Sequence, residues 1–124
     1  MSAETRRQVL IIDNNEDVLA TLGRELKEAG YDTVTTWSGV EALRLLNSRT
    51  FDSLLVDDYL PDLYIGDFLE RVSRLPVRPR ILVMQAKPGK NARLSESRGA
   101  WSLVDKSQIV TLITVLDAVR GWIH

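Results

Sequence analysis

The sequence contains no cysteine, and its single histidine, His124, is the last residue. Without cysteine there can be no disulfide, no thiolate nucleophile and no zinc site built from thiolates. A lone terminal histidine also argues against a histidine-based catalytic triad and against a metal site with several imidazole ligands. Any chemistry on this chain therefore has to use carboxylates, amides, hydroxyls, lysine or arginine.

An excess of charge and long apolar runs are missing as well. The chain has 16 basic and 17 acidic residues and a formal net charge of -1, so its overall charge does not favour nucleic acid or a membrane surface. No apolar run approaches the roughly 20 residues of a membrane-spanning helix. The first residues lack the apolar core of a signal peptide. We therefore expect a cytoplasmic protein that contacts neither nucleic acid nor membrane directly.

The sequence does contain a regular alternation of short apolar runs and amphipathic segments. The apolar runs predict strands at residues 9–13, 31–37, 51–57, 80–84 and 100–105. The segments between and after them predict helices at residues 14–30, 38–48, 66–75, 91–98 and 107–123. The second helix begins with Ser38 and carries a Ser-x-x-Glu capping box to Glu41. We expect one domain over residues 1–124, with a flexible tail at residues 1–7.

Alternating strands and helices with short connections predict a parallel sheet that is covered by helices on both faces. We predict an α/β fold of the flavodoxin-like, doubly wound type, with five parallel strands in the order 2-1-3-4-5. In such a sheet, ligands bind outside the carboxyl ends of the strands at the point where the strand order reverses. Here that point lies between the first and third strands.

Polar residues stand at the carboxyl ends of four predicted strands: Asp13 and Asn14, Asp57 and Asp58, Gln85, and Asp105 and Lys106. With the predicted order, Asp13, Asn14, Asp57 and Lys106 converge on one crevice. Carboxylates that lie close together repel one another, and a hard divalent cation such as Mg²⁺ cancels that repulsion. Lysine is a compact charge that suits a phosphoryl group. The combination indicates phosphoryl transfer onto a carboxylate.

At these positions the chain resembles the receiver domain of two-component response regulators. The resemblance covers about residues 9–119 and rests on Asp13 after the first strand, on Asp57-x-x-x-Pro61, and on Lys106 after the fifth strand. It implies that Asp57 accepts a phosphoryl group from a histidine kinase or a phosphotransfer protein, and that Lys106 contacts this group. It also implies a Mg²⁺ site made by Asp13, Asn14, Asp57 and the backbone carbonyl of Tyr59.

The resemblance further implies an output surface formed by the fourth helix, the fifth strand and the fifth helix. This face would bind a downstream protein or a second copy of the chain. Asp58, next to the phosphoacceptor, would point away from it by strand alternation and serve as a loop carboxylate or a cap.

Several residues depart from the receiver pattern. Asn14 replaces the second acid, so we expect weaker Mg²⁺ binding and slower phosphorylation. Gln85 replaces the hydroxyl residue that normally follows the fourth strand, and it could either donate to the phosphoryl group or block the site. Leu103 replaces an aromatic switch residue, and Ser107 replaces a cis-proline. A glycine usually follows the proline by four residues, whereas Gly66 follows Pro61 by five.

Three functions remain open on these residues. The first is a phosphoaccepting receiver, a signalling domain whose only catalysis is the phosphoryl transfer to itself. The second is a pseudo-receiver that binds a protein partner without phosphate, which the replacements at Asn14, Gln85 and Leu103 favour. The third is an aspartate-nucleophile phosphatase of the haloacid dehalogenase type. That class needs Asp-x-Asp after the first strand, and here the run is Asp13-Asn14-Asn15, so it is the weakest of the three.

Overall fold

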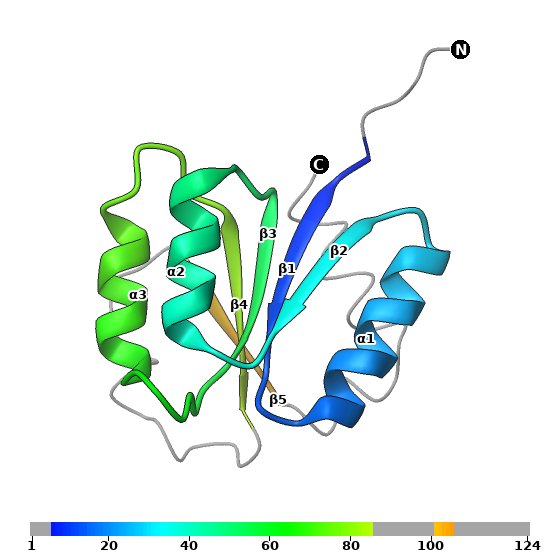
Figure 1. Cartoon of the computed structure of the whole chain (residues 1–124), viewed down its shortest axis with the longest axis horizontal. Helices are drawn as coiled ribbons and strands as arrows, with labels where there is room; N and C mark the ends of the chain where they lie inside the picture. Colours follow the sequence, from blue (N-terminus) through cyan, green and yellow to red (C-terminus); the bar gives the residue numbers. More distant parts are fainter. Residues whose placement is uncertain (1–5, 86–100, 106–124) are drawn as a thin grey trace.

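The computed structural model describes residues 6–85 and the backbone of residues 101–105 (Figure 1). Its elements are β1 Gln8–Ile12, α1 Glu16–Glu28, β2 Asp32–Thr36, α2 Gly39–Ser48, β3 Ser53–Asp57, α3 Ile65–Ser73, β4 Arg80–Gln85 and β5 Trp101–Asp105. Each strand and helix predicted in this part of the chain is present, with ends shifted by no more than two residues. The helices predicted at residues 91–98 and 107–123 lie outside the described residues.

The five strands form one parallel sheet in the order β2-β1-β3-β4-β5, which confirms the predicted fold. Helix α1 covers one face, and helices α2 and α3 cover the other (Figure 1). The order reverses between β1 and β3, because the chain adds β2 on one side of β1 and later strands on the other. The carboxyl ends of β1 and β3 therefore lie side by side.

Strand alternation divides the core into two layers. On the α2 and α3 face, Leu54 and Val56 of β3 pack with helical residues such as Phe68, which is fully buried. On the α1 face, Leu55 of β3 packs with Leu22 and other α1 residues. The central strands are apolar on both faces because both faces are covered. This alternation decides on which face each polar residue at the strand ends emerges.

A capping side chain begins α1, and a glycine ends it. The Oδ1 atom of Asn15 accepts hydrogen bonds from the backbone N–H groups of Asp17 at 2.9 Å and Val18 at 3.2 Å. These bonds satisfy donors that the first turn leaves without intrahelical partners. At the other end Gly30 has φ +103°, a backbone conformation that favours glycine and ends the helix.

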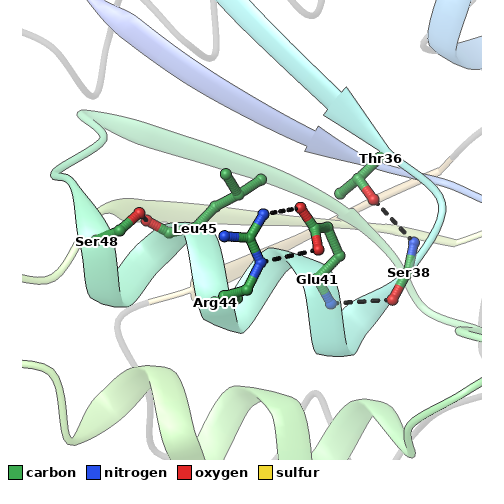
Figure 2. Close-up of polar contacts among 6 residues, drawn as sticks. All are labelled: Thr36, Ser38, Glu41, Arg44, Leu45 and Ser48. Carbon is green, nitrogen blue, oxygen red and sulfur yellow. Dashed lines mark hydrogen bonds and ion pairs between the residues drawn. The ribbon is translucent and has the colours of Figure 1, made fainter.

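Only half of the predicted capping box of α2 is present. The Oγ atom of Ser38 accepts a hydrogen bond from the backbone N–H of Glu41 at 2.9 Å (Figure 2). The prediction of the reciprocal bond, from the Ser38 N–H to the Glu41 carboxylate, is wrong. The Glu41 carboxylate binds the guanidinium of Arg44, and the Ser38 N–H donates to Oγ1 of Thr36 at 3.2 Å (Figure 2). Glu41 takes the cationic partner one turn along, where a charge-assisted bond is available.

Arg7 lies directly before the amino end of β1, in the segment of residues 1–7 that was expected to be a flexible tail. Its carbonyl accepts a hydrogen bond from the backbone N–H of Asp32 at 2.9 Å, next to the first paired residues of β1 and β2.

Within residues 6–85 and 101–105, no helix has the length and apolar character needed to cross a membrane.

Candidate functional site

Two aspartates meet at the carboxyl ends of β1 and β3. Ile12 of β1 is paired with Val56 of β3, so Asp13 and Asp57 are the next residues on neighbouring strands. The backbone N–H of Asp13 donates to Thr36 at 3.1 Å, which continues the β1–β2 ladder by one residue. By alternation both side chains continue the row of Ile11 and Leu55, on the α1 face. Neighbouring strands lie about 4.8 Å apart, so the two carboxylates belong to one site.

Both carboxylates are buried, which is unusual for aspartate. The exposed fraction is 0% for Asp13 and 3% for Asp57. Oδ1 of Asp13 accepts a hydrogen bond from the backbone N–H of Asn15 at 2.8 Å, in the turn that leads into α1. Since Asn15 also caps α1, this turn fixes the Asp13 carboxylate relative to the helix. Asn14, between them, is exposed.

The next two residues of the Asp57 segment differ sharply from Asp57 in their surroundings. Asp58 is half-buried and lies just beyond β3, and its N–H donates to the carbonyl of Met84 at 2.9 Å. The Tyr59 side chain is 60% exposed, so its ring takes no part in a buried site. This agrees with the expectation that only the Tyr59 backbone carbonyl is a candidate ligand, which itself stays a prediction.

Gln85 is the last residue of β4 and is buried, with 6% exposed. Met84 is paired with Asp57, so Gln85 stands one residue further along the sheet edge. By alternation the Gln85 side chain continues the row of Val83, on the α2 and α3 face. Asp57 and Gln85 therefore leave the sheet on opposite faces, and the expected contact of Gln85 with a phosphoryl group stays a prediction.

The donor set at this edge suits Mg²⁺ in kind, because every candidate ligand atom is an oxygen and two belong to buried carboxylates. Mg²⁺ takes few protein ligands and keeps several waters, so a small set is sufficient. Among the described residues, no three side chains of His, Cys, Asp or Glu gather into a metal site. Any site here would therefore rest on Asp13 and Asp57, with neutral oxygens from Asn14 and Tyr59.

Three predicted positions on the β5 side are not described. Lys106 and Ser107 lie outside the described residues, as does the side chain of Leu103. The backbone of β5 is paired with β4 up to Asp105, opposite Gln85. The strand that precedes Lys106 therefore ends at the same edge of the sheet as Asp57, and the role of Lys106 stays a prediction.

The segment of residues 58–64, here named the access loop, connects β3 to α3 and contains a residue that the sequence analysis missed. The carboxylate of Asp62 accepts hydrogen bonds from the Ser38 hydroxyl at 2.6 Å and from the backbone N–H groups of Gly39 at 2.9 Å and Val40 at 3.2 Å. Asp62 is exposed, and the partial desolvation at its contact with α2 would by itself raise the pKa of the carboxyl. The hydrogen bonds outweigh this effect and lower that pKa below its ordinary value. Only the fold brings Asp62 to α2, since the two are more than 20 residues apart.

Comparison with known proteins gives a consistent result over most of the chain. The family model of the response regulator receiver domain matches residues 9–117. Sporulation initiation phosphotransferase F of Bacillus subtilis is 22% identical over 94% of this chain and 93% of its own length. Transcriptional regulatory protein PrrA of Mycobacterium bovis is 37% identical over 57 residues, which are 46% of this chain and 24% of that protein. The match to PrrA thus spans about a quarter of the longer protein.

The fold has solved counterparts. Response regulator protein TrrA of Thermotoga maritima, solved in complex with Mg²⁺-BeF, superposes with a TM-score of 0.75. The superposition covers 91% of this chain and 98% of TrrA, at 20% sequence identity. At that identity the likeness establishes the shared fold.

Proposed function

Because this chain belongs to the response regulator receiver domain family, we propose that Asp57 accepts a phosphoryl group from a phosphohistidine of a histidine kinase or phosphotransfer protein. The observation that carries the proposal is the pair of buried carboxylates, Asp13 and Asp57, on adjacent strand ends where the sheet order reverses. Aspartate carboxylates act as nucleophiles in enzymes that form an aspartyl phosphate, and metal coordination can activate them.

In the proposed reaction, a carboxylate oxygen of Asp57 forms a bond to phosphorus while the bond from phosphorus to the donor imidazole breaks. The product is an acyl phosphate on Asp57, and the imidazole leaves as the free side chain. A Mg²⁺ ion at Asp13, Asn14, Asp57 and the Tyr59 carbonyl would neutralise charge on the phosphoryl oxygens. Asp13 is already oriented by the N–H of Asn15, and Lys106 would contact the phosphoryl group.

On this proposal the chain is a signalling domain and not a turnover enzyme, because the acceptor is its own side chain. The names of two similar proteins support the proposed phosphoryl transfer and the proposed Mg²⁺ site. One is named a phosphotransferase, and TrrA was solved in complex with Mg²⁺-BeF. The proposed output is a downstream protein or a second copy, bound through β5 and the helices predicted at residues 91–98 and 107–123. We assign the protein to the cytoplasm, without direct nucleic acid or membrane contacts.

A second candidate function is that of a pseudo-receiver, which binds a partner without phosphate. It is favoured by the uncharged Asn14, which replaces the second acid of the receiver pattern, and by Leu103, which replaces an aromatic switch residue. It is also favoured by Gln85, a long amide that replaces a small hydroxyl residue at the end of β4.

Intact-mass spectrometry after incubation with Mg²⁺ and acetyl phosphate distinguishes the two candidates. Asp58→Asn is the matched control for Asp57→Asn, since it removes the same charge one residue along. We expect a phosphate adduct on the wild type and on Asp58→Asn, and none on Asp57→Asn. A folded wild type without an adduct at any Mg²⁺ concentration would rule out the phosphoacceptor and leave the pseudo-receiver.

A further inference from the structure

The backbone of Tyr59 lies between two anchors on the access loop. The first anchor is Asp58, whose N–H donates to the Met84 carbonyl at 2.9 Å and ties the loop to β4 directly after Asp57. The Tyr59 side chain cannot hold the backbone in place, because 60% of it is exposed. The position of the Tyr59 carbonyl therefore depends on what holds the chain on either side of it.

The second anchor is the amino end of α2. Leu60 is buried, with 5% exposed, in the core layer that includes α2 and α3. Two residues later, the Asp62 carboxylate binds the Ser38 hydroxyl and the N–H groups of Gly39 and Val40. Three hydrogen bonds to one carboxylate fix this part of the loop more firmly than a single contact would.

Gly39 makes this close approach possible. A Cβ atom on Gly39 would lie 2.9 Å from Cδ1 of Leu60, 3.3 Å from Cβ of Leu63 and 3.5 Å from Oδ1 of Asp62. A side chain on the first residue of α2 would therefore press on Leu60 and Leu63 of the access loop and force them to shift. The loop and the helix end are shaped to fit each other.

The electrostatics of this anchor are favourable. The free N–H groups at the start of a helix carry partial positive charge, which an anionic carboxylate offsets. Ser38 links the two sides, because its hydroxyl donates to Asp62. The same oxygen accepts a hydrogen bond from the backbone N–H of Glu41 (Figure 2). At neutral pH the Asp62 carboxylate is ionised and keeps all of these bonds.

We propose that Asp62 is a positioning residue for the metal site: by holding the access loop on α2, it fixes the Tyr59 backbone carbonyl beside Asp57. The inference rests on the proposed function, in which this carbonyl and Asp57 are Mg²⁺ ligands. It assigns α2 a part in the affinity of the site, although α2 contributes no ligand. On this inference, removing the Asp62 carboxylate leaves Asp13 and Asp57 in place and loosens only the Tyr59 carbonyl.

Calorimetric titration of Mg²⁺ into the purified full chain, without a phosphodonor, tests this inference. We expect Asp62→Ala to weaken Mg²⁺ binding roughly tenfold, in the range found for residues that orient metal ligands. Asp62→Asn keeps an amide oxygen for the N–H donors, so its affinity should lie between those of Asp62→Ala and the wild type. The matched control is Asp67→Ala, which removes an exposed acid from the first turn of α3.

The outcomes separate the inference from the proposed function. Equal affinities for the wild type, Asp62→Ala and Asp62→Asn would overturn the inference alone. A loss of the same size in Asp67→Ala would also overturn it, because the effect would then reflect net charge. If the wild type bound no Mg²⁺, the proposed metal site and the inference would fall together. Should Asp62→Ala fail to fold, Asp62→Asn decides the question.

Discussion

Asn14 is the residue at which the proposed site departs most from the receiver pattern. It follows the buried Asp13 and precedes Asn15, the cap of α1, and it is exposed. An amide oxygen can bind Mg²⁺ but brings no charge, and the charge count of the ligands tunes the affinity of such sites. On the proposed function, we therefore expect the missing charge at Asn14 to limit the Mg²⁺ affinity of the site.

Asn14→Asp should restore that charge. We expect it to tighten Mg²⁺ binding on the order of tenfold, the effect of one added charge a few ångströms from the ion in a partly screened site. Calorimetric titration of Mg²⁺ measures this directly. Faster labelling by acetyl phosphate should accompany the tighter binding.

Asn15→Asp is the matched control for this variant. It adds the same charge one residue along, and aspartate caps a helix about as well as asparagine does. The α1 cap should therefore survive, and the Mg²⁺ affinity should change little. An equal gain in both variants would show that the general field, and not a ligand position, limits the affinity.

Ser53 has a buried hydroxyl that predicts a change in stability. It begins β3, is fully buried, and its hydroxyl has no hydrogen-bond partner among the residues described. A buried polar group without a partner costs about 1–3 kcal/mol. Ser53→Ala removes that group, so we expect the free energy of unfolding in urea to rise by about 1 kcal/mol.

Ser38→Ala gives the opposite comparison for the same chemical change. The Ser38 hydroxyl caps α2 and binds Asp62, so its loss should lower the free energy of unfolding by about 1 kcal/mol. If Ser53→Ala were as destabilising as Ser38→Ala, the Ser53 hydroxyl would have to be bonded in the folded protein.

At the scale of elements, the contact between the access loop and α2 predicts a pH dependence. Partial desolvation raises the pKa of Asp62, but the Ser38 hydroxyl and the N–H groups of Gly39 and Val40 outweigh it and lower that pKa below its ordinary value of 3.8. A lowered folded-state pKa means that the unfolded chain binds the proton more tightly. The contribution of the Asp62 carboxylate is therefore complete well above pH 3.8 and is lost as the pH falls below it.

Asp62→Asn isolates this contribution, because the other acids are common to both proteins. The difference in unfolding free energy between wild type and Asp62→Asn should be constant from about pH 6 to 8 and should shrink in acid. Urea titrations at several pH values give the curve. A difference that stays constant down to pH 3 would mean that the charge of Asp62 adds nothing to the cap.

The elements themselves could be read from the sequence because their signals are local. The apolar periodicity acts within a few residues, and the structure contains the strands and helices that it predicts in the described part of the chain. The Glu41 half of the capping box was wrong because Arg44 offers that carboxylate a cation on the same helix face. Local patterns cannot rank two partners that are both within reach.

At the scale of the molecule, the topology explains which site residues could be foreseen. Once the strand order is known, Asp13 and Asp57 must meet, because β1 and β3 are neighbours and both residues end their strands. Asp62 could not be foreseen, since its partners are on α2 and only the packing of the access loop brings them together. Nor did the sequence reveal that Gln85 follows the face opposite to Asp57, which depends on the register of β4.

The last prediction concerns the stability of the whole domain. A ligand that binds the folded chain and not the unfolded one stabilises it, by about 2.7 kcal/mol at a concentration 100 times its dissociation constant. Mg²⁺ should therefore raise the melting temperature of the wild type, and EDTA should reverse the rise. Asp57→Asn should lose this response, because it removes one of the two buried carboxylates on which the site rests. Asp58→Asn should keep it, since Asp58 lies beyond β3 and is only half-buried. Equal responses of the wild type and Asp57→Asn would place Mg²⁺ elsewhere on the chain, and would remove the physical basis for a phosphoacceptor at the end of β3.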